Sequence, residues 1–550
     1  MARRLDAFVV TGAHSIGGGK RPPLGAFTIG ALLLIGLGLS PGAVAQQSGG
    51  ILKIGHFASP ASMSMLEEST IAVNRPMSGV FNNLVMFKQD EPQNTPDTII
   101  PELATGWTWS EDGTELTFPL HKGVKWHDGK PFTAKDVKCT IDLLQGKASE
   151  KLRINPRKSW FDNVSDVTTN GDYEVSFHLK RPQPSLLSML ATGWTPIYPC
   201  HVSPAQMRLH PIGTGPFKFV EFKPNQSIKV IKNPDYWKPG RPYLDAIEWT
   251  IIPSRATQLL SFIAGNFDMT FPYELTVPML KDVQSQMPGA VCEVTPTNFA
   301  PNALMTRKPP FDNPELRKAV AMTIDHQAFI DILGEGKGDI GTAVLPEPEG
   351  QWAMPKEMRE QLPGYGPDVA KSREEARKIM KSLGYGPDKH LPIKISARNL
   401  PDYRDAASLL IDQLKEIYIE AELDLVETAN WLPRLVRSDF VLAQSVAGAG
   451  IDDPDQTFYE NYSCKSNRNY THYCDPEIEK LIDQQSMESD QEKRKKLVWE
   501  IDRRLQEAVV RPIEYYMRKA TCMRPEVKGV TIMANSSYNG WRMEDVWLDK

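Results

Sequence analysis

Long apolar runs are missing from the sequence after its first 45 residues. No later segment reaches the ~18 consecutive apolar residues that a membrane-spanning helix requires, so we expect nothing beyond residue 45 to span a membrane. The leader holds one uncharged apolar run, residues 25–39, and its 15 residues are short for a spanning helix.

Short catalytic and metal-binding motifs are also missing. HExxH, GxSxG and CxxC do not occur. Glu102, His121, His127 and Asp128 could be combined into a metal or acid–base site, but lone histidines and carboxylates beside turns are usually solvated or capping groups. The sequence therefore predicts no catalytic residue, no metal site and no cofactor, and a protein that is not an enzyme.

The first 45 residues have the parts of a secretory signal peptide. Four basic residues precede the apolar run: Arg3, Arg4, Lys20 and Arg21. Ala-Val-Ala at 43–45 forms a small-residue cleavage site after it. We expect cleavage there and not retention of the segment as a membrane anchor. We interpret Arg3 and Arg4 as ordinary basic residues of the leader and not as a twin-arginine signal. No cysteine follows the site, so we expect a periplasmic protein that is not a lipoprotein.

Charge and length limit the remaining chain. Removal of residues 1–45 takes away four basic residues and one acidic residue, which changes the formal net charge from −5 to −8. A mildly acidic, mixed surface argues against nucleic-acid binding. About 505 residues remain, which is more than one core usually holds, so two or more lobes are expected.

All six cysteines follow residue 45 and would face an oxidising compartment. Cys464 and Cys474 are ten residues apart in a polar loop, and we expect them to form a disulfide. A metal site that includes His472 is the alternative, but the spacing fits no zinc pattern. The other four cysteines can pair in three ways or stay reduced as buried thiols, and the sequence leaves this open.

The periodicity of apolar residues changes along the chain. Residues 51–300 are rich in short strand patterns, residues 301–505 alternate helix and strand patterns, with one helix expected over 316–333, and residues 510–550 return to strands and turns. This order predicts an α/β chain that leaves one lobe, builds a second and returns. Segments 297–302 and 511–514 are the expected hinge crossings.

Five sequence blocks carry a family resemblance. They are residues 101–137, 213–217, 233–237, 309–325 and 453–477, and they include Gly-Thr-Gly-Pro-Phe at 213–217 and Asp-Pro-Asp at 453–455. In order and spacing they resemble the large extracytoplasmic solute-binding proteins of ABC importers, family 5, which contains dipeptide, oligopeptide and nickel receptors. Most of these blocks we interpret as structural: Gly213 and Gly215, for example, suit a turn where backbones approach closely.

The resemblance implies a two-lobed periplasmic-binding-protein (Venus-flytrap) fold of the large peptide-receptor type, with a two-segment hinge. We expect the signal peptide at 1–45, lobe I at 46–300 with an inserted subdomain around 90–210, lobe II at 301–507, and a return to lobe I at 508–550. A ligand would be buried between the closing lobes. The implied partners are a small-molecule solute and the permease and ATPase of an inner-membrane ABC complex, with the receptor itself a monomer.

The resemblance also points to ligand-binding candidates. Peptide receptors of the family bind the ligand's ammonium group with an Asp three residues before the acidic-Pro pair, and that position is Gly450 here. Asp452 could substitute only if the loop is rebuilt. Arg398, with Arg404 as its rival, matches the arginine that binds the ligand's carboxylate, and Trp431 matches a position near the cleft. The loop at 60–65 contributes Ser62, Met63 and Met65.

These features predict the solute-binding component of an ABC importer. Its solute would be peptide-like, an amino-acid conjugate or glycoside-like, and the missing carboxylate at Gly450 argues against free peptides because an enclosed ammonium needs a partner. A nickel chelate or haem is less favoured. A periplasmic chaperone or signalling receptor on the same fold is the alternative, and a secreted hydrolase is less favoured than either.

Overall fold

The computed structural model describes residues 46–550. The predicted signal peptide at 1–45 lies outside the described residues. Within 46–550, no helix combines the length and the apolarity that crossing a bilayer would take. Below, lobe I denotes residues 46–300 and 508–550, and lobe II denotes residues 301–507, which are the boundaries expected from the sequence.

The main sheet of lobe I has four strands in the order β1-β10-β9-β8. They are β1 (Ile51–His56), β8 (Phe217–Lys223), β9 (Ser227–Lys232) and β10 (Ala246–Ile251). β1 pairs with β10 in parallel and the other pairs are antiparallel. The expectation that residues 51–300 are rich in short strands is confirmed by these elements.

A second four-stranded sheet of lobe I has the order β4-β5-β7-β6. Its strands are β4 (Thr108–Trp109), β5 (Glu115–Pro119), β6 (Val164–Thr169) and β7 (Glu174–Leu179). Helix α2 (Ala134–Gln145) packs beside it. The backbone N–H of Thr133 donates to Asp136 at 2.9 Å, which fixes the start of α2, and a disulfide joins Cys139 of this helix to Cys200.

Smaller elements complete lobe I up to residue 300. They are α1 (Ile71–Ser78), β2 (Val85–Phe87), η1 (Pro96–Thr98), β3 (Ile99–Pro101), η2 (Lys158–Phe161), α3 (Leu186–Ala191), α4 (Pro204–Leu209), α5 (Arg255–Ile263), α6 (Val277–Gln286) and β11 (Val291–Pro296).

Gly213 and Gly215 lie where two backbone segments meet. A Cβ atom on Gly213 would stand 1.9 Å from the carbonyl oxygen of Val80, and one on Gly215 would stand 2.5 Å from the carbonyl carbon of the same residue. No other residue fits at either position. The block at 213–217 therefore holds the end of α1 against β8 and has a structural role, as the sequence indicated.

Lobe II is built on a sheet with the order β12-β16-β14-β15. Its strands are β12 (Ala300–Met305), β14 (Leu391–Arg398), β15 (Ile419–Val426) and β16 (Leu442–Ala447). β14 lies parallel to β15 and β16, while β12 is antiparallel to β16. The other elements are α7 (Pro314–Thr323), α8 (His326–Gly334), β13 (Gly338–Asp339), α9 (Lys356–Arg359), α10 (Val369–Ser382), α11 (Pro401–Lys415), α12 (Thr428–Val436), α13 (Pro454–Asn461), α14 (Pro476–Met487) and α15 (Gln491–Glu507).

The single helix expected over 316–333 is wrong. The chain forms two helices, α7 and α8, because it turns at Ile324 and starts a new helix at Asp325. The Asp325 side chain accepts a hydrogen bond from the backbone N–H of Ala328 at 3.0 Å. A carboxylate that caps a helix N-terminus competes with continuation of the preceding helix.

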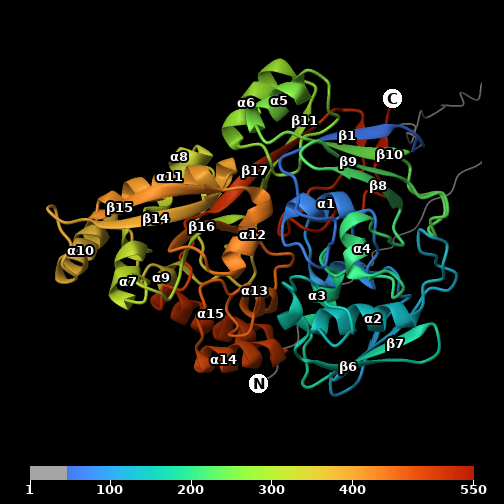
Figure 1. Cartoon of the computed structure of the whole chain (residues 1–550), viewed down its shortest axis with the longest axis horizontal. Helices are drawn as coiled ribbons and strands as arrows, with labels where there is room; N and C mark the ends of the chain where they lie inside the picture. Colours follow the sequence, from blue (N-terminus) through green and yellow to red (C-terminus); the bar gives the residue numbers. More distant parts are fainter. Residues whose placement is uncertain (1–45) are drawn as a thin grey trace, which may run out of the picture. The chain divides into compact units, whose positions relative to one another are not determined.

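Two chain segments join the lobes side by side. The backbone N–H of Glu514 donates to Pro301 at 2.9 Å, and that of Ala303 donates to Pro512 at 3.1 Å. β17 (Tyr516–Met523) then pairs with β11 of lobe I, where Cys292 and Cys522 form a disulfide. β17 accordingly runs between the sheet of lobe II and the elements of lobe I (Figure 1).

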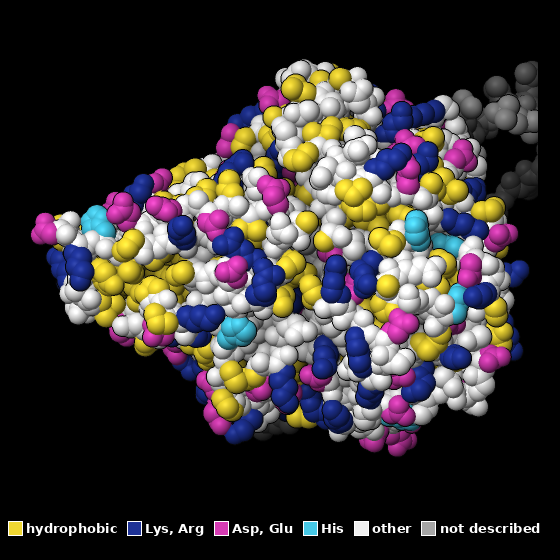
Figure 2. Space-filling model, viewed as in Figure 1, with side chains coloured by type: hydrophobic (Ala, Val, Ile, Leu, Met, Phe, Trp, Pro, Cys, Tyr) yellow, Lys and Arg dark blue, Asp and Glu magenta, His cyan; other side chains and the backbone are white. Residues whose placement is uncertain are grey.

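The chain ends in lobe I, where β18 (Val527–Lys528) pairs with β19 (Trp547–Leu548). The side chain of Arg542 binds Glu102 at 2.9 Å, so the C-terminal segment is anchored on the N-terminal part of the same lobe. On the face that Figure 2 shows, acidic and basic side chains are intermixed, as the composition indicated.

Candidate ligand cleft

A cavity of about 80 Å³ lies between the two lobes. It is lined from lobe I by Phe57, Ser69, Thr70, Ile71, Arg255, Tyr273, Glu274, Phe299 and Tyr538, and from lobe II by Arg398, Leu400, Pro401, Asp402, Tyr403, Val446 and Arg468. Many of these residues come from the ends of β1 and β14, the starts of α1 and α11, and the C-terminal segment. We call this cavity the cleft.

Four polar atoms of the cleft wall lack hydrogen-bond partners. They are Ser69 Oγ, Thr70 Oγ1, Arg398 Nη2 and Arg468 Nε, and each is buried without a partner among the described residues. Buried polar groups in folded proteins are nearly always paired. Four unpaired groups that line one cavity mark a place where a bound molecule would complete the hydrogen bonds.

Arg398 stands at the C-terminal end of β14 and is 3 % exposed. Its Nε donates to Thr428 Oγ1 at 3.1 Å, and its guanidinium lies 5.9 Å from the ring centre of Phe57 and 5.6 Å from that of Tyr403. No carboxylate among the described residues forms an ion pair with it. A buried guanidinium stays charged and is costly without a counterion, so the cleft favours an anionic group at this point.

The two acidic residues of the cleft wall are already paired. Arg255 lies 3.0 Å from both Glu274 and Asp402, and Lys519 lies 2.5 Å from Asp402. Burial by itself would raise the pKa of Asp402, but these two cations outweigh it and hold the pKa at about 2. Asp402 belongs to lobe II and its partners to lobe I, so this cluster also ties the closed lobes together.

The predicted loop residues lie behind the cleft wall. Ser62 donates to Glu68 at 2.9 Å, and Met63 and Met65 are buried in the core of lobe I. None of the three lines the cleft, and ligand contact by them stays a prediction. Phe57 and Ser69, which flank this loop, line the cleft instead.

Trp431 and Arg404 are also outside the lining. Trp431 is buried and packs edge-on against Tyr403, with ring centres 5.8 Å apart, so it supports a residue that does line the cleft. Arg404 is partly exposed and lies 3.6 Å from Asp405. Of the two arginines considered for an anion, the structure therefore brings Arg398 to the cleft.

Gly450 packs closely against lobe I. Its N–H donates to Gln456 at 2.7 Å, and its carbonyl accepts hydrogen bonds from Ser536 and Asn539, both at 2.8 Å. A Cβ atom here would already stand 3.5 Å from the Trp194 ring. The position expected to hold an ammonium-binding carboxylate is thus a closely packed, hydrogen-bonded contact between the lobes.

Asp452 lines a second cavity, of about 470 Å³, between the lobes. Its carboxylate accepts a hydrogen bond from the backbone N–H of Gln351 at 3.0 Å, and burial, with a smaller effect of Asp453, raises its pKa to about 7. None of the buried, unpaired side-chain atoms among the described residues lines this cavity. The smaller cleft therefore remains the stronger ligand candidate.

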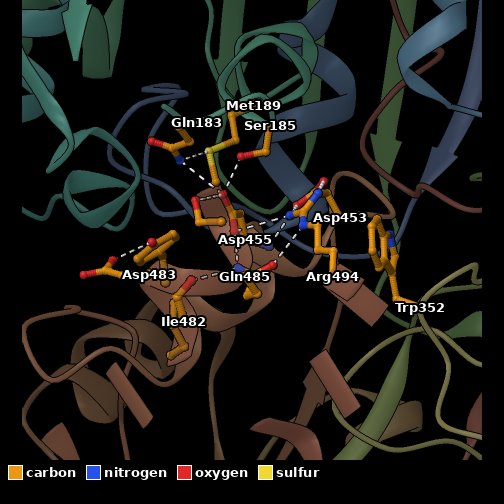
Figure 3. Close-up of polar contacts among 12 residues, drawn as sticks. Gln183, Ser185, Met189, Trp352, Asp453, Asp455, Ile482, Asp483, Gln485 and Arg494 are labelled. Carbon is orange, nitrogen blue, oxygen red and sulfur yellow. Dashed lines mark hydrogen bonds and ion pairs between the residues drawn. The ribbon is translucent and has the colours of Figure 1, made fainter. Parts of the chain in front are cut away.

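A polar network beside this second cavity joins the lobes at Asp455 (Figure 3). The Asp455 carboxylate accepts hydrogen bonds from Gln183 at 3.3 Å and from Ser185, both in lobe I. Ser486 of lobe II donates to the same oxygen at 2.6 Å. Arg494, which binds Asp453 at 2.7 Å, supports the network from α15.

Several cleft residues were not foreseen from the sequence. Arg468 lies in the loop between Cys464 and Cys474, which form the expected disulfide. Tyr538 comes from the C-terminal segment, and Ser69 and Thr70 precede α1. For Arg468, the one local sequence signal was the short polar loop between the two cysteines, since a loop closed by a disulfide can hold a side chain in a fixed position.

Two lobes with a cleft between them are the arrangement of a two-lobed binding protein. Residues 98–469 match the family described as "Bacterial extracellular solute-binding proteins, family 5 Middle". The chain belongs to this family.

Individual proteins agree with this assignment. The chain is similar to "Probable di/tripeptide-binding protein 5" of Pseudomonas aeruginosa, with 27% identity over 78% of this chain and 82% of the relative. It shares its fold with the Helicobacter pylori DppA protein solved with the peptide STSA (TM-score 0.80, 22% identity, 92% of this chain and 99% of the other). It also shares its fold with the Agrobacterium tumefaciens R10 protein AgaA solved with agropinic acid (TM-score 0.79, 22% identity, 91% and 99%). The family match and the sequence similarity support a substrate-binding role in ABC transport, and the two solved structures show the fold.

Proposed function

We propose that this protein captures an anionic, peptide-like solute or amino-acid conjugate in the cleft and delivers it to an ABC permease in the inner membrane. The single observation that carries the proposal is Arg398, a buried guanidinium that lines the cleft with one unpaired N–H group and no carboxylate partner. A solute carboxylate would accept a charge-assisted hydrogen bond from it.

The remaining lining supports a solute with an apolar body and further polar groups. Phe57, Phe299 and Tyr403 supply flat aromatic surface, while Ser69 and Thr70 supply free hydroxyl groups. A mostly apolar wall with a few well-placed polar groups is typical of small-molecule sites. Sites for drug-sized ligands measure about 300–1,000 Å³, so the walls of the cleft, which encloses about 80 Å³ here, would widen around such a solute.

Free peptides are the second candidate. Proteins that bind di- and tripeptides are among the relatives, and this favours a peptide. Gly450 and its packing against Trp194 argue against a free ammonium group at the position where peptide receptors hold it. A conjugate with a substituted amine fits the cleft better, because it places no free ammonium group at this position.

Capture would take place outside the cytoplasm, after cleavage of the leader at residue 45, and the monomer would dock on the permease through both lobes. Catalysis is not part of this proposal. A periplasmic chaperone or signalling receptor on the same fold remains the alternative, and it would lack a partner permease.

A thermal-shift screen of anionic conjugates, sugars, free peptides and metal chelates tests the proposal. A solute that binds the folded state raises the melting temperature, and we expect the hits to carry a carboxylate and to be lost in Arg398→Ala. Hits that stabilise the wild type and Arg398→Ala equally, or chemical turnover of a hit, would overturn it. Transport of the hit by a co-encoded permease separates an importer subunit from a chaperone.

A further inference from the structure

Arg468 places a second guanidinium in the cleft. It lies in lobe II, its side chain is 13 % exposed, and its Nε is buried without a hydrogen-bond partner among the described residues. It lines the same cleft as Arg398.

The loop that carries Arg468 is built to hold it in place. The disulfide between Cys464 and Cys474 closes the loop. The backbone N–H of Arg468 donates to Ser466 Oγ at 3.1 Å, and Asn469 donates from its side chain to Ser463 at 3.2 Å. The position of the arginine is therefore fixed before a solute arrives, which lowers the entropic cost of binding.

Glu460 holds the guanidinium from one side. It is 2 % exposed and forms an ion pair with Arg468 through Nη1. Because this contact uses one edge of the guanidinium, the Nε edge stays free for a second acceptor. A planar guanidinium commonly binds two acceptors on different edges in this way.

The surroundings of the cleft carry more positive than negative charge. Arg157, which stacks 3.9 Å from the Trp194 ring, donates to the carbonyl of Glu68 at 2.6 Å but forms no ion pair with a described carboxylate. Trp194 in turn packs against Tyr538 of the cleft wall, with ring centres 5.0 Å apart. With Arg398 also unpaired, at least two buried cations lack a counterion at or behind the wall.

We propose that the cleft selects solutes with two anionic groups, one bound by Arg398 and the other by Arg468. This rests on the proposed function and narrows it to a substrate class: dianionic conjugates such as those of glutamate or aspartate, in which the amine is substituted. One negative charge on the solute would balance Arg398, which has no ion-pair partner, and the second would accept a charge-assisted hydrogen bond from the free Nε edge of Arg468.

The test uses two matched pairs of probes in calorimetry. In each pair an N-substituted glutamate or aspartate conjugate is compared with the glutamine or asparagine conjugate of the same substituent, so that the members differ by one carboxylate. We expect the wild type to bind the dianionic member of at least one pair 10-fold or more tightly than its amide. Arg468→Gln should remove that preference and leave the affinity for the amide within about threefold.

Control variants separate the dianion proposal from the proposed function as a solute-binding protein. Lys465→Gln, an exposed change on the same loop, should keep the preference, and Arg468→Lys should restore only part of it. Equal affinities within every pair, no binding by any member, or equal losses for both members in Arg468→Gln would overturn the dianion proposal. If Arg398→Ala still abolishes hits from the thermal-shift screen, the proposed function survives that failure.

Discussion

Ser185 of lobe I donates a hydrogen bond to the carboxylate of Asp455 in lobe II, and Asp455 has no exposed surface. Bonds of this kind form only when the lobes are closed. Ser185 and Asp455 lie outside the cleft lining, but such bonds contribute to the free energy of closure and therefore to affinity.

Ser185→Ala should weaken solute binding only because it destabilises the closed arrangement of the lobes. A hydrogen bond to a charged group contributes about 1.5–3 kcal/mol, so we expect affinity to fall roughly 10- to 100-fold, measured by calorimetry. Ser486→Ala is the matched control, because Ser486 binds the same carboxylate from within lobe II and that bond is present in the open state too. Equal losses in the two variants would show that Asp455 stabilises lobe II and does not act as a latch.

Arg398→Ala should weaken an anionic solute by about 2–4 kcal/mol, because truncation removes a buried, charged hydrogen-bonding partner. The unliganded protein should behave differently. Since Arg398 is a buried cation without a counterion, replacement by leucine should leave the unliganded melting temperature unchanged or higher. A large loss of unliganded stability in Arg398→Leu would mean that the arginine is structural.

The family resemblance pointed to Arg398, and the family was identified through blocks whose roles proved structural, such as the glycines at 213 and 215. Arg468 and Tyr538 could not be found in the same way. Arg468 lies at the cleft because a disulfide closes its loop, and Tyr538 lies there because residues 508–550 return to lobe I. Both placements depend on tertiary structure and leave no local sequence pattern. The pairing of Cys292 with Cys522 likewise follows from the register of β11 against β17.

Unmodified di- and tripeptides should bind poorly, because Gly450 supplies no carboxylate for the ammonium group. Blocking the amine of the same peptide should therefore cost little affinity or improve it, measured by calorimetry on free and N-acetylated forms. Gly450→Asp should not create a peptide site, since the new side chain would meet Trp194 and Gln456. Tight binding of free dipeptides with a strong loss on acetylation would show that another acid holds the ammonium.

Asp452 should make stability depend on pH. Its pKa is raised in the folded state from 3.8 to about 7, so the unfolded chain releases this proton first and the folded state loses stability as pH rises between these values. We expect urea unfolding at pH 4.5, 6 and 7.5 to show that the free energy of unfolding of Asp452→Asn rises relative to that of the wild type as the pH increases. Glu488→Gln, which lines the same cavity, serves as the control. Parallel pH profiles for wild type and Asp452→Asn would contradict this account.

Removal of the Cys464–Cys474 disulfide should affect both stability and binding. By the chain-entropy estimate it contributes about 2–3 kcal/mol to stability, and its loop positions Arg468. The double serine variant should therefore bind the solute more weakly at a temperature where it remains folded. Replacement of Cys139 and Cys200, which do not line the cleft, should lower the free energy of unfolding without changing affinity. Unchanged affinity in both variants would remove the loop from the site.

The structure of the protein with its solute bound tests the central claim most directly. We predict a solute between the lobes with a carboxylate oxygen within hydrogen-bond distance of Arg398 Nη2, and with polar atoms that satisfy the hydroxyl groups of Ser69 and Thr70. A solute seated in the cavity beside Asp452, with Arg398 still unpaired, would contradict the account.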